Sequence, residues 1–340
     1  MERVSAAPGA PRRLSIVLEW ANTRLHGVPR AHVVLEALAR QWQEIAEGDL
    51  PATLAPVARG LLRGLDRRAD LVIVSGERPG AALDEGLQRR LSEHFDVRVE
   101  LAEGLEYYPL KNFGAGLTRG DLLLFVDSDV LPEQGWLAHL LGSFADPGVG
   151  VVCGQTYVAP TDVFARAFAL GWTYELRDDS GRLVHPRKFY ANNIVFRRDV
   201  FERTGFRPLG RRSRGAVSLL RADLDALGIP VWENRMARVD HPPPTSFRHM
   251  VVRALAHGRD HYMKDSEVRT LQGLERSVGI AWRRLRRGFS RTFAHWRTVG
   301  LRRRDVPAAL LIISAYYGFF ALGGVLTHVH PAAMGRHFRV

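Results

Sequence analysis

The sequence contains a single cysteine, Cys153, in 340 residues. One thiol cannot form a disulfide within the chain, so a disulfide scaffold is excluded and a reducing compartment is favoured. Cys153 ends the apolar run 149–153, where a small core residue is expected. Residues 1–13 also lack the apolar run of a secretory signal peptide. We therefore expect the main body to stay in the cytoplasm.

Acidic residues are absent from residues 276–304, which contain ten arginines. This segment accounts for +10 of the formal net charge of +12, so the rest of the chain is nearly neutral. An arginine run of this kind suits an anionic membrane surface or a nucleic acid. In residues 278–296 the arginines alternate with aromatic residues, which is typical of a helix lying on a membrane surface.

Charged residues are absent from residues 306–329, a stretch of 24 residues. It is long enough to span a bilayer, and Arg302, Arg303 and Arg304 form the positive flank expected on the cytoplasmic side. One serine and three glycines interrupt it, so a buried core helix is the alternative. We expect a C-terminal anchor at the cytoplasmic face of the membrane, which favours an anionic membrane surface over nucleic acid as the partner.

Short apolar runs alternate with helical patterns through the first half of the chain. This alternation predicts an α/β fold with a doubly wound, mainly parallel sheet, followed by C-terminal amphipathic and membrane-associated helices. The expected strands are 14–18, 69–74, 97–101, 122–126, 149–153 and 231–239, with a strand-like run ending near 198. The expected helices are 31–47, 83–94, 107–117, 163–176, 199–204, 216–227, 245–264 and 278–296.

Two carboxylates follow the apolar run 122–126. One residue separates Asp127 from Asp129, and Pro132 stops the strand from continuing. Ligands of an open α/β sheet bind at the carboxyl ends of its strands, and a hard divalent cation prefers oxygen ligands. The pair therefore indicates a metal site, although Asp and Ser are also ordinary turn residues.

Several motifs in order resemble family 2 glycosyltransferases of the GT-A fold, over residues 13 to about 245. The resemblance rests on a strand followed by Asn22, on Lys111-Asn112-x-Gly114-x-Gly116, on Asp127-Ser128-Asp129, on Asn193-x-x-Phe196-Arg197-Arg198 and on Ala237-x-Val239-x-His241. The basic and apolar segments after them resemble membrane-bound members that build envelope polysaccharides or glycolipids.

The resemblance implies a metal site. Asp127 and Asp129 would hold Mg²⁺ or Mn²⁺ against the diphosphate of a nucleotide-sugar, and His241 would complete the site. The metal would neutralise the charge that develops on the leaving diphosphate. A surface histidine at a strand end is the alternative for His241.

The resemblance also assigns substrate contacts. It places Lys111 and Asn112 along the nucleotide, Glu19 and Asn22 at the nucleoside pocket, and Asn192, Asn193 and Arg197 on the acceptor side. The second strand usually ends in an acidic residue that reads the base. Here Ser75 and Gly76 follow Val74, and Glu77 is the candidate substitute.

The acidic pair that inverting members use as a base is missing, because its place falls on residues 215–217, Gly-Ala-Val. Direct displacement needs a group that takes the acceptor's proton. Among Asp178, Asp179, Asp223 and Glu233 we favour Asp178 or Asp179, since a flexible turn could close over the acceptor. A retaining reaction, or a non-catalytic membrane-tethered binding or assembly subunit, is the alternative.

The predicted organisation has five parts. They are a flexible tail (1–12), the glycosyltransferase domain (13–245), interfacial basic helices (246–305), a membrane-spanning or re-entrant helix (306–329) and a second tail (330–340). The predicted function is metal-dependent transfer of a sugar from a nucleotide-sugar donor to a glycan or lipid-linked acceptor at the membrane.

Overall fold

The computed structural model describes residues 10–77, 83, 85–181, 183–209, 215–263 and 270–337. The chain divides into two compact units. An α/β unit takes the chain up to residue 156 together with 178–207 and 217–240, and a helical unit takes 157–177, 208–216 and the chain from 241 onward. The last boundary lies close to the expected one at 245. Residues 157–177 and 208–216, which the sequence pattern placed in the glycosyltransferase domain, fall in the helical unit.

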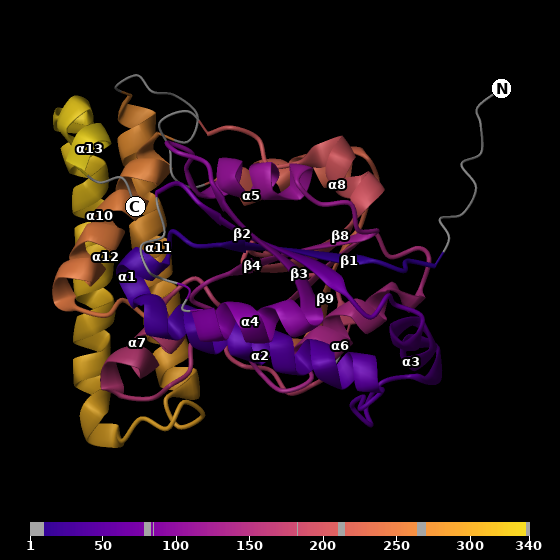
Figure 1. Ribbon diagram of the computed structural model, residues 1–340. Helices are drawn as coiled ribbons and strands as arrows, with labels where there is room; N and C mark the ends of the chain where they lie inside the picture. The colour runs from indigo at the N-terminus through magenta and orange to yellow at the C-terminus, as the bar shows by residue number, and fades with distance from the viewer. Residues whose placement is uncertain are drawn as a thin grey trace. The chain divides into compact units, whose positions relative to one another are not determined.

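A nine-stranded sheet forms the centre of the α/β unit in the described part of the chain. Its order is β3-β2-β1-β4-β8-β6-β9-β5, with β7 paired to β9 (Figure 1). The strands are β1 Leu14–Glu19, β2 Ala69–Ser75, β3 Phe95–Leu101, β4 Leu122–Asp127, β5 Leu131–Pro132, β6 Val151–Tyr157, β7 Leu183–Val184, β8 Asn193–Arg197 and β9 Val231–Asp240.

The sheet is parallel in one half and antiparallel in the other. Strands β1 to β4 pair in parallel. Strand β8 runs antiparallel to both β4 and β6, and β9 runs antiparallel to β5 and β7. The predicted α/β fold class is confirmed, whereas the mainly parallel character holds only as far as β4.

Helices cover both faces of this sheet. In Figure 1, α2, α4 and α6 lie on one face and α5 and α8 on the other. Helix α5 packs closely on β1, because a Cβ atom at Gly114 would lie 2.6 Å from Cγ1 of Val17. The helices are α1 Thr23–His26, α2 Val28–Glu47, α3 Pro56–Arg63, α4 Glu85–His94, α5 Tyr107–Gly116, α6 Trp136–Gly142, α8 Arg198–Thr204 and α9 Ala216–Ala226.

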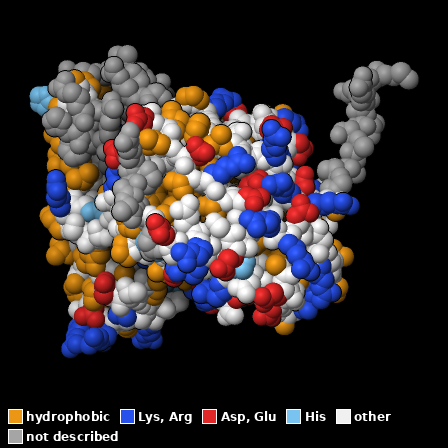
Figure 2. Space-filling model, viewed as in Figure 1, with side chains coloured by type: hydrophobic (Ala, Val, Ile, Leu, Met, Phe, Trp, Pro, Cys, Tyr) orange, Lys and Arg blue, Asp and Glu red, His pale blue; other side chains and the backbone are white. Residues whose placement is uncertain are grey.

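Strands β1, β2 and β4 are buried along their whole length. Their apolar side chains form the core with α2 and α6, so the carboxyl ends of β1 and β4 are held in fixed positions. On the side of this unit that Figure 2 shows, basic and acidic side chains are intermixed, as expected for a solvated surface.

The helical unit contains α7 Val163–Gly171, α10 Phe247–Tyr262, α11 Leu271–His295, α12 Val306–Val329 and α13 Pro331–His337. Helix α12 matches the apolar stretch predicted from the sequence, and it is long and apolar enough to cross a membrane by length and composition. Helix α11 begins seven residues before the predicted start at 278, behind the N-cap Thr270.

Two expectations for this unit are wrong. The predicted helix 163–176 ends at Gly171, because the backbone becomes extended at Trp172, whose indole Nε1 donates to the Tyr316 hydroxyl at 3.1 Å. The predicted tail 330–340 forms α13 over Pro331–His337, with proline at a helix start where its missing N–H is not needed. The expected tail at 1–12 lies largely outside the described residues.

Candidate active site

The site begins where two neighbouring parallel strands end. Glu19 is the last residue of β1 and Asp127 the last residue of β4, and the two are partners in the strand register. The Ser128 N–H donates to the Glu19 carbonyl at 3.2 Å, which fixes the turn after β4. Both side chains are buried, so two carboxyl groups meet in a place with little solvent.

Helix α5 supplies the cation that offsets this charge. Lys111 is fully buried, and its Nζ lies 2.6 Å from Oδ1 of Asp127. Tyr107 stands one helical turn earlier on the same face, and its hydroxyl donates to Oδ2 of Asp127 at 2.6 Å. The amide of Asn22 donates to the same oxygen at 3.2 Å. The carboxylate of Asp127 is therefore held by three donors, of which the sequence analysis identified Lys111 and Asn22 as site residues but not Tyr107.

Glu19 has an unusual protonation state. Its pKa is raised from 4.5 to about 8, chiefly by burial and next by the charge on Asp127, while Lys111 acts in the opposite direction. Its Oε1 accepts from the Ala21 N–H, and among the described residues its Oε2 has no hydrogen-bond partner. Glu19 thus carries a proton over much of the neutral range. Because the Glu19 side chain is fully buried, Glu19 supports the turn after β4 and does not line a nucleoside pocket as the resemblance implied.

Asp129 has different neighbours. Its Oδ2 lies 3.4 Å from Nε2 of His26, and both side chains are almost completely buried. Arg30 donates from Nε to the Asp129 backbone carbonyl at 2.5 Å and also pairs with Asp240 at 3.2 Å. His26 and Arg30 were missed from the sequence. Their position shortly after β1 could have indicated a place near the site. However, Gly27, at φ +82°, interrupts the helical spacing that would have put them on one face with Asn22.

Metal ligands are few within the described ranges. They contain no group of three or more His, Cys, Asp or Glu side chains arranged to hold a metal ion. Asp127 is already paired with an ammonium group, so Asp129, with His26 beside it, is the better candidate ligand in the α/β unit.

His241 lies in the helical unit. It is buried beside the rings of Trp172 and Tyr174, with ring centroids 5.5 and 4.9 Å away. Nδ1 lies 2.8 Å from the Pro242 carbonyl, so it is the protonated nitrogen when it donates there, and Nε2 carries the lone pair of the neutral ring. This tautomer suits a metal ligand. Its place beside Asp127 and Asp129 stays a prediction.

Two further residues predicted on the nucleotide side, Asn112 and Glu77, have partners within the protein. Asn112 forms two hydrogen bonds with the backbone of Phe206, at 2.7 and 3.0 Å, so its amide joins α5 to the segment after α8. Glu77 is exposed after the end of β2, and its carboxylate pairs with Arg24 at 2.5 Å. Glu77 is accessible to a ligand, and its reading of a base stays a prediction.

The three acceptor-side candidates are all buried. Asn193 accepts from the Trp136 indole at 2.8 Å and lies beside Val126, near the carboxyl end of β4. Asn192 accepts from the Thr156 hydroxyl at 3.2 Å. Arg197 pairs with Leu122, at the opposite end of the same strand.

The assignment of Arg197 to the acceptor side is therefore corrected. Its guanidinium donates to the carbonyls of Val149 and Phe144 at 2.9 and 3.3 Å, and burial lowers its pKa. These contacts give Arg197 a structural role.

The two candidate bases differ in environment. The carboxylate of Asp178 accepts from the Ser180 N–H and pairs with Arg235, and these contacts lower its pKa, with the Ser180 bond as the largest cause. A lowered pKa makes a carboxylate a weaker base. Asp179 is largely exposed and lies 3.6 Å from Arg238.

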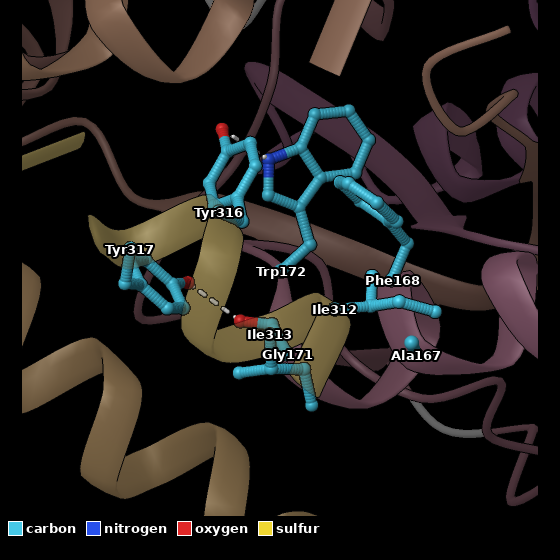
Figure 3. A pocket seen from close by; sticks show the side chains of 8 residues that line it. All are labelled: Ala167, Phe168, Gly171, Trp172, Ile312, Ile313, Tyr316 and Tyr317. Atoms are coloured by element: carbon cyan, nitrogen blue, oxygen red, sulfur yellow. Dashed lines mark hydrogen bonds between the residues drawn. The ribbon is translucent and has the colours of Figure 1, made fainter. Parts of the chain in front are cut away.

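The helical unit contains a small apolar pocket between α7 and α12 (Figure 3). It is lined by Ala167, Phe168, Gly171, Trp172, Ile312, Ile313, Tyr316 and Tyr317. Tyr316 accepts from Trp172, and the Tyr317 hydroxyl donates to the Gly171 carbonyl at 2.5 Å. With no acidic or basic side chain in its lining, the pocket is unsuited to a nucleotide diphosphate.

Comparisons with known proteins find similarity in the stretch that contains β4. The family model described as glycosyl transferase family 2 matches residues 73–213, which include Lys111, Asp127 and Asp129. A stretch of 42 residues is 48% identical to the pre-mycofactocin glycosyltransferase of Mycobacterium tuberculosis, in the strains CDC 1551 / Oshkosh and ATCC 25618 / H37Rv. That match covers 12% of this chain and only 9% of the mycobacterial protein.

Among solved structures, the mannosyltransferase PcManGT from Pyrobaculum calidifontis, solved in complex with GDP-Man and Mn²⁺, has a similar fold. The TM-score is 0.50 at 13% sequence identity, over 97% of this chain and 92% of that one. The predicted GT-A fold is thereby confirmed. The family model matches less than half of the chain, in the stretch where the order of the motifs also resembles family 2 glycosyltransferases.

Proposed function

We propose that this protein is a metal-dependent glycosyltransferase that moves a sugar from a nucleotide-sugar donor to a glycan or lipid-linked acceptor at the membrane. The observation that carries the proposal is the turn after β4, in the stretch that the family model matches. There Asp129 lies 3.4 Å from His26, while the neighbouring Asp127 is paired with the buried Lys111. The family match and the likeness to PcManGT, which binds GDP-Man and Mn²⁺, support a nucleotide-sugar as the donor.

The residues present fit a metal ion that is shared with the donor. Asp129 and His26 supply two ligand groups, and no larger set occurs in the described residues of the chain. Mg²⁺ characteristically takes one or two protein carboxylates and completes its shell with waters and substrate phosphates. When bound, Mg²⁺ or Mn²⁺ would stabilise the charge on the leaving diphosphate.

The protein's own groups prepare this position. Lys111 pairs with Asp127, and Tyr107 and Asn22 hold the carboxylate of Asp127 in one orientation. Arg30 fixes the backbone of Asp129 through its carbonyl. Preorganised charges of this kind need no rearrangement when the diphosphate arrives.

For the acceptor's proton we propose Asp179 rather than Asp178. Asp178 is held by Arg235 and Ser180, whereas the carboxylate of Asp179 is exposed on the same turn. Asp179→Asn is then expected to reduce kcat with donor binding unchanged, and Asp178→Asn to act mainly on stability. Equal turnover in wild type and Asp179→Asn would remove this assignment.

We further propose that the helical unit attaches the chain to the cytoplasmic face of an anionic membrane. Its exposed Arg302, Arg303 and Arg304 lie directly before the apolar helix α12. Such a location suits a glycolipid or envelope polysaccharide acceptor.

The test is a donor screen on the purified full chain. Three proteins are mixed with Mn²⁺ and a panel of nucleotide-sugars: wild type, Asp129→Asn and the control Asp66→Asn. Asp66 is exposed and lies far from Asp129 in the sequence. Nucleoside diphosphate release and the thermal shift are measured. We expect one donor to give both signals in wild type and in Asp66→Asn, and neither in Asp129→Asn. A wild-type protein that binds and turns over no donor would contradict the proposal.

A further inference from the structure

We infer that α12 lies in the plane of the membrane, as one half of a two-helix platform with α11, instead of crossing the bilayer. This inference rests on the proposed membrane attachment and specifies its geometry. Throughout, "the platform" means α11 (Leu271–His295) and α12 (Val306–Val329).

Helix α11 accompanies α12 in the antiparallel direction. Ser277 near the start of α11 packs against Gly324 near the end of α12, and Gly288 packs against Ile313 further back in α12. Between these contacts the Arg284 guanidinium lies over the Phe320 ring, 5.6 Å from its centroid. The two helices have 25 and 24 residues, so α12 has α11 beside it for most of its length.

A membrane crossing by α12 would therefore place α11 in the hydrocarbon too. The middle of α11 carries the exposed side chains Arg283, Arg286 and Arg287. A helix of 24 residues is about 36 Å long and the hydrocarbon core is about 30 Å thick, so these arginines would sit near the bilayer centre. Exposed arginines are strongly disfavoured at that depth.

Helix α10 adds a second obstacle. A Cβ atom at Gly258 of α10 would lie 1.9 Å from the Phe320 carbonyl of α12, so the two helices are in close contact. The next residues of α10, Arg259 and Asp260, form a buried ion pair at 2.7 Å, and Arg259 also donates to the Met334 carbonyl. Helix α12 is thus packed on one side against α10, which carries a buried ion pair directly after the contact.

The other side of α12 is apolar and exposed. Leu311 is 70% exposed, and Leu322, Val325 and Val329 lie on the same face. In Figure 2, hydrophobic side chains line the visible edge of the helical unit over α10 and α12, and Lys and Arg gather at the end where α11 leads into α12. A bare apolar face along a whole helix indicates contact with another apolar surface.

Helix α11 also has an exposed apolar face. Leu271, Val278, Trp282 and Phe293 form an exposed apolar stripe, with spacings typical of one helix face. The stripe is on the flank opposite the contacts with α10 and α7. Those contacts are made by Gly273 against Tyr262, and by Arg291, which donates to the carbonyls of Ala169 and Tyr174.

The order of side chains around α11 suits a lipid interface. The apolar stripe adjoins Arg283 and Arg286 on the outward side, where long basic side chains reach headgroup phosphates while their stems stay in apolar surroundings. Trp282 and Phe293 are residue types of the interfacial layer. This charge pattern favours an anionic leaflet over a second copy of the same basic chain as the occupant.

The first experiment tests topology by cysteine labelling. Thr298→Cys lies in the connection between α11 and α12, and His330→Cys lies directly after α12, so the two positions flank the helix. Both are placed in a Cys153→Ser background, in which the buried native thiol is removed. Everted membrane vesicles from expressing cells are treated with a membrane-impermeant maleimide, with and without detergent. The platform predicts that both positions react in intact vesicles. Reaction at only one end, or at neither end until detergent is added, would overturn it.

A depth measurement separates the platform from a re-entrant helix. Ala308→Cys, Gly318→Cys and Val325→Cys, all on the outward side of α12, carry a fluorophore that is quenched by spin-labelled lipids of known depth. The platform predicts equal depths for the three. A deeper Gly318 position would show a re-entrant helix and contradict the inference.

Flotation tests the surface itself. The full chain is mixed with vesicles of phosphatidylcholine, with or without phosphatidylglycerol. Trp282→Ser combined with Leu311→Ser should weaken partitioning about tenfold or more, because two large apolar side chains are lost from the contact. Val57→Ser, which removes a comparably exposed apolar side chain from α3, is the control and should float like wild type.

Three outcomes would overturn the platform: a wild-type chain that stays in solution, a double variant that floats normally, or a soluble dimer that the double variant dissociates. The last would show that a second copy covers this face. None of these readouts uses donor turnover, so loss of the platform and loss of the proposed transferase activity are distinguishable.

Discussion

Asp127 and Asp129 are two positions apart, yet their side chains have different surroundings. Asp127 lies 2.6 Å from a lysine that is itself fully buried. Asp129 lies 3.4 Å from His26. The first carboxylate balances a buried ammonium group, and the second is the one proposed above as a metal ligand.

This difference predicts different costs of mutation. Asp127→Asn and Lys111→Met are each expected to lower the free energy of unfolding by about 3–5 kcal/mol, because each leaves a buried charge without its partner. The double variant should lose less than the two single losses combined. Urea unfolding measures all three. Asp129→Asn is the comparison and should be much milder; strictly additive losses for Asp127 and Lys111 would contradict the pairing.

Glu19 predicts a pH dependence of stability. Its pKa in the folded chain is about 8, against an ordinary value of 4.5, chiefly because it is buried. Between these values the folded state keeps a proton that the unfolded chain has released, so stability falls as pH rises, by at most about 1.4 kcal/mol per pH unit. Below the lower value this contribution is fully present.

Glu19→Gln should remove that slope. Measured by urea unfolding, the free energy of unfolding of the variant should rise steadily relative to wild type between about pH 5 and pH 8, because glutamine imitates the protonated side chain. Glu93→Gln, on the exposed side of α4, should follow the wild-type curve. A constant difference between Glu19→Gln and wild type across this range would show that Glu19 does not titrate there.

The sequence predicted the candidate site at the level of strand ends but not of contacts. An apolar run followed by Asp-Ser-Asp was enough to place two carboxylates at the carboxyl end of a strand, as observed. The roles of Asn112 and Arg197 depend on partners far away along the chain, at Phe206 and Val149. No local pattern encodes such partners, so both were assigned to substrates by resemblance alone.

At the scale of elements, close packing of α5 on the sheet depends on one glycine. A Cβ atom at Gly114 would lie 2.6 Å from Val17 and 3.0 Å from Val74, whereas nothing lies within 4 Å of one at Gly116. Gly114→Ala should lower stability by about 1–3 kcal/mol through overpacking, despite the better helix propensity of alanine.

Gly116→Ala is the matched control in the same helix and should be neutral or stabilising by up to about 1 kcal/mol. Thermal unfolding of both variants measures the difference. Because Gly114 holds α5 near β1, its replacement should also disturb the contact of Lys111 with Asp127. Equal stability of the two variants would show that α5 can move away from the sheet without cost.

Long apolar elements could be predicted well, and short or partner-dependent ones could not. Helix α12 has its predicted limits because nothing charged interrupts it. Strands β5 and β7 have two residues each and exist through pairing with β9, so they leave no periodic signal. The antiparallel half of the sheet was also missed, since strand direction depends on how the chain returns and not on the composition of the strand.

At the scale of the whole molecule, charge and fold are divided between the units. Ten of the arginines behind the net charge of +12 lie in residues 276–304, in the helical unit. The α/β unit, which carries Asp127 and Asp129, is close to neutral. The proposed donor site and the proposed membrane-binding surface therefore belong to different units, so salt should weaken vesicle binding more than donor binding.

The proposed metal site predicts how the stability of the protein responds to metal ions and chelators. Since no group of three ligand side chains occurs in the described ranges, the folded chain should not depend on a resident ion. A chelator is therefore expected to leave the melting temperature unchanged, and Mn²⁺ alone should raise it little. Mn²⁺ together with the nucleoside diphosphate of the donor that the screen identifies should stabilise the protein by about 2.7 kcal/mol at a hundredfold excess over Kd. Asp129→Asn should lose this joint effect and Asp66→Asn should keep it, because Asp129 is the proposed ligand of the ion shared with the diphosphate. A melting temperature that falls on chelation alone would instead indicate a complete metal site within the protein.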